Sequence, residues 1–197
     1  MAVSVHAGMT DVTNTGSTAG AATKDGSAPA APYRERAHNA FVRSARGGRV
    51  LSALMLPDFM LAPPSGFGVL TTTGRRTGKR RRKCIRAVRR DDQVYLVMLG
   101  PALTSDPTAV SAWLWNIRAN PNVTLRIRGG TFKGVARELE APSERDRARE
   151  TYCETVHPFD YAMCLFHRSG RPTRAKIQQM TRHWFDVGTP LVVDLDA

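Results

Sequence analysis

The sequence predicts an α+β fold: a split antiparallel β-barrel of about six strands, with one inserted helix and flanking terminal helices. Two observations favour this class. Short apolar or alternating segments recur with turn residues between them, which is typical of antiparallel sheets. Strands and helices do not alternate regularly, which disfavours a doubly wound nucleotide-binding fold. A small closed or split barrel is therefore the best physical match.

The 197 residues are enough for one domain with a hydrophobic core and an appendage. Residues 1–32 are mostly Ala, Thr, Ser, Gly and Pro, so we expect a disordered N-terminal tail, followed by the split-barrel domain at 33–197. The tail lacks the basic start and the apolar run of a secretory signal. No segment reaches the roughly 18 apolar residues that a membrane-spanning helix needs.

Two helical stretches are expected at the start of the domain. Residues 34–45 are typical of a short basic helix that ends at Gly47 and Gly48. Residues 49–61 follow with an apolar face that Pro57 breaks. Such a pair packs on its own domain in most proteins, but it can also rest on an anionic membrane surface. Peripheral membrane association through residues 34–61 therefore stays open.

The first three strands are expected at residues 66–73, 80–88 and 93–99. The first two flank a turn bracketed by Gly74 and Gly78, which can adopt φ > 0 without a steric penalty. A polar turn, Arg-Arg-Asp-Asp, leads into the third. The third strand is apolar on both faces, which is typical of a central strand.

An inserted helix and a hairpin come next. Asp106 and Pro107 predict the N-cap and the first turn of a helix that continues through a Trp-rich segment. Residues 123–128 alternate apolar and polar side chains, as in a strand with one buried face. Gly129 and Gly130 are a two-residue hairpin signal, so the return strand is expected at 131–140.

The C-terminal part is expected to be helical before one last strand. Ser143 and Asp146 resemble a capping box at the start of a helix that continues to about residue 156. Two further helices are expected at 159–167 and 173–185, and the last strand at 190–195.

The charge predicts an anionic partner. Lys and Arg total 29 against 17 Asp and Glu, so the formal charge is +12. Nucleic acid, an anionic membrane surface and a polyanionic small molecule all fit this excess. Cys84, Cys153 and Cys164 form no Cys-x-x-Cys motif, so neither a disulfide framework nor a zinc site is expected, and a reducing cytoplasm is the predicted location. The histidines lack metal-ligand spacing, and no metal is expected.

The cations are concentrated in one turn and the strand after it, at Arg75, Arg76, Lys79, Arg80, Arg81, Arg82 and Lys83. Thr73 and Thr77 add hydroxyl groups close by. Arginine binds phosphate in a bidentate, charge-assisted geometry, so this turn suits an oxyanion with more than one charge. A solvated, charged hairpin turn is the alternative. An apolar strand leads into the turn, which favours the anion site.

Two segments carry a resemblance to a known family. Leu-Thr-Thr-Thr-Gly-Arg-Arg-Thr-Gly at 70–78, with Arg81 after it, and Trp-Leu-Trp-Asn-Ile-Arg-Ala-Asn-Pro at 113–121 resemble the deazaflavin-dependent nitroreductase-like family. That family has the split flavin-binding barrel of the pyridoxamine-phosphate oxidase superfamily. The resemblance covers about residues 67–139. The chain departs from it at 99–102, where many members have a Ser/Asn-x-Gly-Gly-like segment.

The resemblance implies binding of coenzyme F420, a deazaflavin with a phosphodiester and a polyglutamate tail. The turn and the start of the second strand would hold the phosphate and tail, and backbone amides of 81–86 would lie beside the ring. The implied cofactor-binding residues are Thr73, Gly74, Arg75, Arg76, Thr77, Lys79, Arg81, Arg82, Lys83, Cys84, Ile85, Arg86, Trp113 and Asn116. Tyr161 resembles tyrosines over the family's substrate pocket and is the candidate proton donor.

The implied function is hydride transfer from reduced coenzyme F420 to an apolar electrophile such as a quinone, an enone or a nitroaromatic. Flavin mononucleotide (FMN) on the same barrel is the nearest alternative, because its phosphate also suits the arginine turn. A carrier of coenzyme F420 without turnover is a second alternative. Nucleic acid is disfavoured, since the basic stretch lacks interleaved aromatic residues. A homodimer and a location at the inner face of the membrane stay open.

Overall fold

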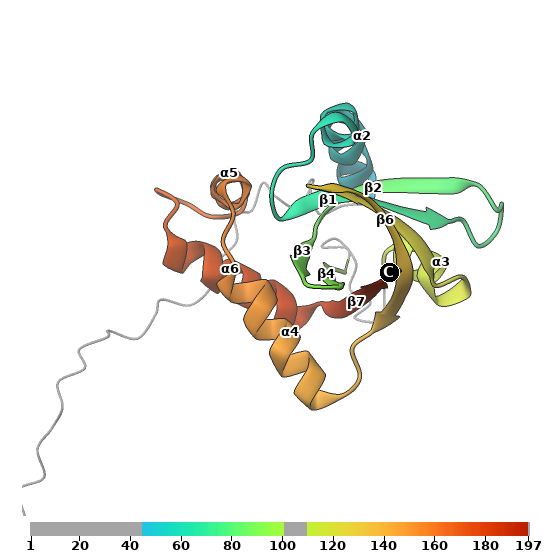
Figure 1. Ribbon diagram of the computed structural model, residues 1–197. Helices are drawn as coiled ribbons and strands as arrows, with labels where there is room; N and C mark the ends of the chain where they lie inside the picture. Colours follow the sequence, from blue (N-terminus) through green and yellow to red (C-terminus); the bar gives the residue numbers. More distant parts are fainter. Residues whose placement is uncertain (1–44, 101–109, 197) are drawn as a thin grey trace, which may run out of the picture. The chain divides into compact units, whose positions relative to one another are not determined.

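Seven antiparallel strands form one curled sheet in the order β2-β1-β5-β6-β7-β4-β3 (Figure 1). The computed structural model describes residues 45–100 and 110–196. The strands are β1 (Phe67–Thr73), β2 (Arg80–Arg86), β3 (Val88–Arg90), β4 (Gln93–Met98), β5 (Asn122–Ile127), β6 (Gly130–Glu138) and β7 (Thr189–Leu195).

The sheet curls because its two edge strands are consecutive in the chain. β2 and β3 lie at opposite edges of the sheet, yet only Ala87 separates them. The chain can make this step only if the sheet bends until its edges approach each other, as in a split barrel. The predicted fold class is confirmed, and the seventh strand arises because the expected strand at 80–88 divides at Ala87. Arg89 and Arg90, expected in a turn, pair with Val94 and Gln93 instead.

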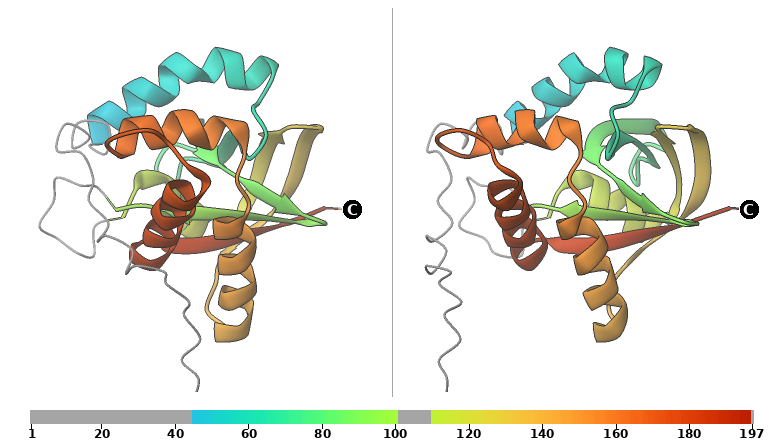
Figure 2. Two further views of the ribbon diagram at one scale, coloured as in Figure 1. Left: turned by 90° about the vertical axis from the view of Figure 1, so that its left-hand side faces the viewer. Right: turned by 60° about the vertical axis from the view of Figure 1, so that its left-hand side comes forward.

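Five helices are described: α2 (Ala45–Leu61), α3 (Ala112–Ala119), α4 (Pro142–Glu154), α5 (Pro158–His167) and α6 (Arg174–Val187). α2 covers β1 and β2, while α4 and α6 pack outside β4 and β7 (Figure 1). α5 lies beside α2, and the rings of Phe59 and Phe159 meet edge to face with centroids 5.6 Å apart (Figure 2). α3 is the helix inserted between strands, as expected.

The barrel interior is the main hydrophobic core, because alternate strand residues point inward. Leu70, Leu96, Leu125 and Leu191 meet there and are fully buried. The apolar face of α3 joins the same cluster through Trp113, Leu114 and Ile117. This helix therefore cannot move away from β1 without opening the core.

Local sequence signals were overridden inside one helix and at several element boundaries. α2 passes through Pro57, where a break was expected, because its Phe59 packs in a cluster with β1. The β5–β6 turn consists of Arg128 and Gly129, one residue earlier than expected. α4 begins at Pro142 with Ala141 as an N-cap that makes no side-chain bond, so the predicted capping box is wrong.

A capping box is present instead at α5, between His157 and Asp160. The expected N-cap Asp106 lies outside the described residues, and Val110 and Ser111 before α3 are not helical. α2 also continues through Gly47 and Gly48, where a helix end was expected.

The predictions for residues 1–32 and for most of the helix at 34–45 lie outside the described residues, so the tail and the domain boundary stay predictions. Within the described ranges, none of the helices is both long enough and apolar enough to cross a membrane. The three cysteines carry free thiols, and Cys153 and Cys164 are buried in apolar clusters.

Candidate functional site

The β1–β2 hairpin turn is closed by backbone hydrogen bonds. Gly74 N donates to Lys79 O at 2.9 Å, and Gly78 N donates to Gly74 O at 2.8 Å. Gly78 has φ = 64°, as its position in the turn predicts. Gly74 does not have a positive φ. It is needed for close approach, because a Cβ there would lie 3.1 Å from Lys79 O.

Helix α3 holds this turn through Asn116. The Asn116 carboxamide accepts a hydrogen bond from Arg75 N at 3.1 Å and donates one to Thr72 Oγ1 at 3.1 Å. Both Asn116 and Thr72 are buried. The carboxamide oxygen and nitrogen of the predicted cofactor residue Asn116 therefore both bond to the chain itself. Through these bonds Asn116 fixes the backbone of the turn against α3.

The pairing register divides the basic strand β2 between two faces. Thr72 lies opposite Arg81 and Leu70 lies opposite Lys83, so these two cations share the face of β1 that meets α3. Ile85 follows on the same face and packs on the interior core. The outer face carries Arg80, Arg82, Cys84 and Arg86. The predicted residues of β2 are thus not all brought together.

β2 also offers backbone donors at an open edge. Gly74 N bonds Lys79 O at the turn, and Ala87 N bonds Gly66 O at 2.8 Å at the other end. Hydrogen-bonded pairs alternate along an antiparallel ladder, so the N–H groups of Arg82, Cys84 and Arg86 point away from β1. Among the residues that the structure describes, no strand pairs with that edge. Of the backbone N–H groups of 81–86, which were expected to lie beside the cofactor ring, only those of Arg82, Cys84 and Arg86 are therefore free of β1.

The hairpin cations are exposed, and no acidic residue of the described ranges pairs with them. The exposed residues are Arg75, Arg76, Thr77, Lys79, Arg80, Arg81 and Arg82, and Thr73 is half-buried. None of the ion pairs recorded within 45–100 and 110–196 involves an arginine or lysine of this group. Lys83 is half-buried, and burial lowers its pKa. Burial raises the pKa of Cys84 to about 11, so its thiol is neutral.

Arg86 is the exception in β2. Its Nε donates to Asp160 Oδ1 at 2.8 Å, Nη1 donates to Tyr152 O at 2.7 Å, and Nη2 donates to Thr155 O at 2.7 Å. The guanidinium also stacks 4.4 Å from the Tyr152 ring centroid. This buried side chain joins the end of α4 and the start of α5 to β2. Its guanidinium packs against α4 and α5, at the end of β2 away from the hairpin cations.

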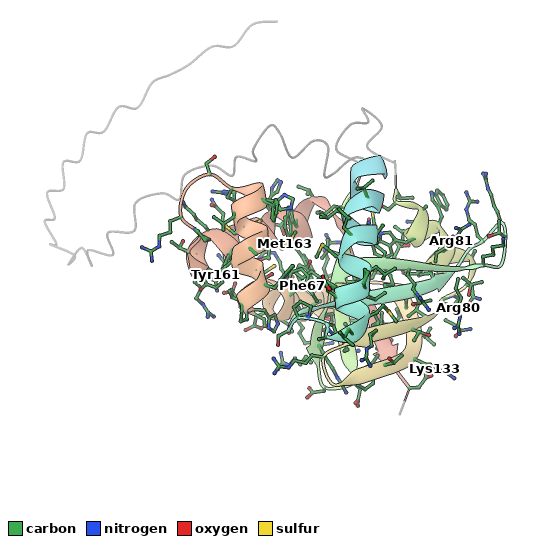
Figure 3. The ribbon with its side chains drawn as sticks, turned by 90° about the horizontal axis from the view of Figure 1, so that it is seen from above. Phe67, Arg80, Arg81, Lys133, Tyr161 and Met163 are labelled. Carbon is green, nitrogen blue, oxygen red and sulfur yellow. The ribbon has the colours of Figure 1, made fainter. Side chains whose placement is uncertain are left out.

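Two aromatic candidates also lie apart from the hairpin. Trp113 is buried in the barrel interior, where it packs as core. Tyr161 is 40% exposed on α5. Figure 3 shows Tyr161 on the side of the domain away from Arg80 and Arg81. Its neighbour Asp160 bonds Arg86, so Tyr161 lies by the end of β2 opposite the hairpin.

The sequence did not identify Thr72 or Trp115 as site residues. Thr72 belongs to the Thr-Thr-Gly segment. Side chains alternate between the two faces of a strand, and Thr72 lies on the same face as the buried Leu70, which could have indicated that it points inward. Trp115 is 43% exposed, and the guanidinium carbons of Arg75 and Arg118 lie 5.4 and 5.1 Å from its ring centroid. Its position two residues after Trp113 puts it on the other side of the helix from the core.

A surface depression of about 550 Å³ lies at the opposite end of β1. It is lined by Leu61, Ala62, Pro63, Pro64, Ser65, Arg126, Ile127, Arg128, Gly129 and Gly130. None of the predicted site residues lines it. The hairpin, by contrast, combines cations that have no acidic partner among the described residues with backbone N–H groups along the open edge of β2. This donor set suits a ligand that has several negative charges and a flat polar edge.

Comparisons with known proteins agree with this assignment of chemistry. The family described as "F420H(2)-dependent quinone reductase" matches residues 34–165. A search of the curated proteins finds no match.

Several solved structures are similar to part of this chain. A structure of an "F420-H2 Dependent Reductase (FDR-A)" is 22% identical over 65% of this chain and 93% of that one, with a TM-score of 0.41. A protein described as a domain-swapped dimer is 24% identical over 65% and 79%, with a TM-score of 0.43. A pyridoxamine 5'-phosphate oxidase candidate from Listeria innocua is 14% identical over 75% and 94%, with a TM-score of 0.36.

Proposed function

The chain belongs to the F420H(2)-dependent quinone reductase family, and from this premise we propose that it transfers a hydride from reduced coenzyme F420 to a quinone. Family membership makes the chain an oxidoreductase with coenzyme F420 as its cofactor, which confirms the resemblance found in the sequence. The acceptor and the residues at work are our proposal. The observation that carries it is the exposed cationic hairpin, which Asn116 anchors to α3 and which forms no ion pair with an acidic residue in the described part of the chain.

The hairpin residues would hold the anionic part of the cofactor. Arg75, Arg76 and Lys79 in the turn would contact the phosphodiester and the carboxylates of the tail, with Arg81 and Lys83 next to them on the inner face. Arg82 and Cys84 would contribute backbone N–H groups at the open edge of β2. Bonds from these groups would orient the polar edge of the ring along the strand.

The reduced cofactor supplies the hydride, so the protein needs no nucleophile or metal for this step. The work of this chain is to bind, to orient and to exclude water. Arg86 ties the start of α5 to the end of β2. We place the acceptor beside α5, whose first turn meets this end of β2 and whose last turn exposes the apolar side chains of Leu165 and Phe166. We assign Tyr161 as the candidate donor of the proton that the reduced acceptor takes up.

The test is anaerobic. Oxidised coenzyme F420 and FMN are titrated separately at low and high salt, and reduced coenzyme F420 is then mixed with a soluble quinone, an enone and a nitroaromatic. Salt-sensitive binding of the deazaflavin with quinone reduction supports the proposal. Preference for FMN would change the cofactor, and tight deazaflavin binding without reduction of any acceptor would leave a carrier. Binding of neither cofactor, together with steeply salt-dependent binding of random DNA, would revive the nucleic-acid alternative.

A second proposal concerns α2 and the membrane. Val50, Leu54 and Leu61 are 51%, 72% and 82% exposed, which is unusual for three apolar side chains of one helix. We propose that this face touches an anionic bilayer, where a quinone would be at hand. Co-sedimentation with anionic vesicles that Leu54→Ser abolishes would support it, and equal recovery of both proteins would contradict it. The homodimer stays a prediction for light scattering.

A further inference from the structure

We propose that Trp115 is a positioning residue that holds the Arg75 side chain ready for the anionic part of the cofactor. This inference rests on the proposed function, because it assigns Arg75 to cofactor binding. It adds Trp115, Arg118 and Glu138 to the residues that matter for the hairpin.

The indole of Trp115 lies between two guanidinium groups. The Cζ atoms of Arg75 and Arg118 lie 5.4 and 5.1 Å from the ring centroid, both within cation–π range. The ring is 43% exposed, so burial of its surface is not its main contribution. Its neighbour Asn116 already fixes the Arg75 backbone. Two successive residues of α3 therefore hold the same turn residue, one by its backbone and one by its side chain.

Arg118 is itself held in place from β6. Its Nε and Nη2 donate to the two carboxylate oxygens of Glu138 at 2.7 and 3.0 Å. This bidentate pair fixes the plane of the guanidinium on one side of the indole. The positive charge of Arg118 is neutralised by Glu138, whereas that of Arg75 has no acidic partner among the described ion pairs. Arg75 is the member of this stack that is left to bind an anion.

The consequence is pre-organisation. A free arginine loses rotamer freedom when it binds an anion, and stacking on the indole reduces that loss beforehand. An exposed cation–π contact corresponds to about two- to fivefold in an equilibrium constant. Loss of Trp115 should therefore weaken binding of the cofactor by roughly this factor and leave kcat unchanged, since no reacting atom is touched.

The experiment is a double-mutant cycle on the full chain, read out as the Kd of oxidised coenzyme F420. Trp115→Ala should raise Kd about two- to fivefold in the wild-type background and hardly at all in the Arg75→Ala background. Trp115→Phe should restore most of the affinity. Arg80→Ala, which removes a neighbouring cation from the opposite face of β2, is the matched control and should not couple to Trp115. An equal loss from Trp115→Ala in both backgrounds would overturn the proposal.

A second readout needs no cofactor. The Arg75 Nε–H proton should show a ring-current shift in the NMR spectrum of the free wild-type protein, and the shift should vanish in Trp115→Ala and persist in Arg80→Ala. An unshifted wild-type resonance would overturn the stacking itself. If the stacking is present and the wild-type protein binds no coenzyme F420, the proposed function fails and the assignment of Arg75 to it fails as well.

Discussion

The two ends of β2 use arginine in opposite ways. At the end next to α5, Arg86 is buried, and each of its guanidinium nitrogens donates to an acceptor of the chain itself. At the hairpin end, Arg80, Arg81 and Arg82 are exposed and take part in no described ion pair. One run of basic residues therefore contains a buried structural clamp and an exposed group of cations that we propose binds an anion.

The difference shows that burial and partners decide what a basic residue does. A buried guanidinium is stable only where acceptors surround it, so the fold supplies Asp160 and two carbonyl groups at Arg86. An exposed guanidinium keeps its hydration and needs no partner. Its donors remain available to a ligand. Four predictions test this contrast.

The largest effect is expected at the buried end. Arg86→Ala removes the charged donor from the buried Asp160 carboxylate, which keeps the bond from His157 N, and from the carbonyl oxygens of Tyr152 and Thr155. The free energy of unfolding should therefore fall by about 3–5 kcal/mol. Urea denaturation followed by circular dichroism measures it. Arg82→Ala, on the same face of the same strand, is the control and should change stability by less than about 0.5 kcal/mol. Equal losses in the two variants would remove the contrast between the ends.

At the hairpin end the effect should fall on binding. Arg76→Ala and Arg81→Ala should each weaken binding of oxidised coenzyme F420 by roughly 1–3 kcal/mol, the range for a lost hydrogen bond to a charged group. Equilibrium titration gives the affinity, and denaturation should show unchanged stability. The phosphate site would have to lie elsewhere if both variants bound as well as the wild type.

Lys83 should make the affinity for the cofactor depend on pH. Burial lowers its pKa in the free protein, and a bound polyanion should raise that pKa again because it favours the charged form. Binding then takes up a proton, so affinity should decline as pH rises between the lowered pKa and the ordinary lysine value. Titrations from neutral to alkaline pH measure the decline. Lys83→Gln should weaken binding and remove this pH dependence; a dependence that persists would belong to another group.

The smallest effect concerns His157, next to the Arg86 clamp. Burial, and then the charge of Arg86, lowers the pKa of His157. The unfolded chain binds a proton near the ordinary value while the folded chain resists it, so stability is full above that value and falls as the pH drops below it. Denaturation between pH 7 and 5 measures the slope. His157→Asn keeps an N-cap side chain and should flatten the curve. An unchanged slope would exclude His157 as its origin.

The sequence predicted the cationic hairpin because charge and turn chemistry are local. The turn glycines and the arginines beside them are consecutive in the chain, so no tertiary contact is needed to bring them together. It did not predict that Arg86 is buried apart from the other cations, because its ion-pair partner, Asp160, lies 74 residues away in the chain. The resemblance placed Trp113 in the cofactor site and left out Trp115, although Trp113 is core and Trp115 is exposed beside Arg75.

The fold class, the family resemblance and the position of the basic turn could all be predicted from the sequence, because hydrophobic periodicity, turn residues and charge act over a few neighbouring residues. The face of β2 that each cation occupies could be found only from the folded structure. Strand pairing fixes the register, and one residue of shift would exchange the two faces. The folded structure also brings Asn116 and Trp115 to Arg75, since contacts between α3 and the turn exist only once the sheet has curled around the core.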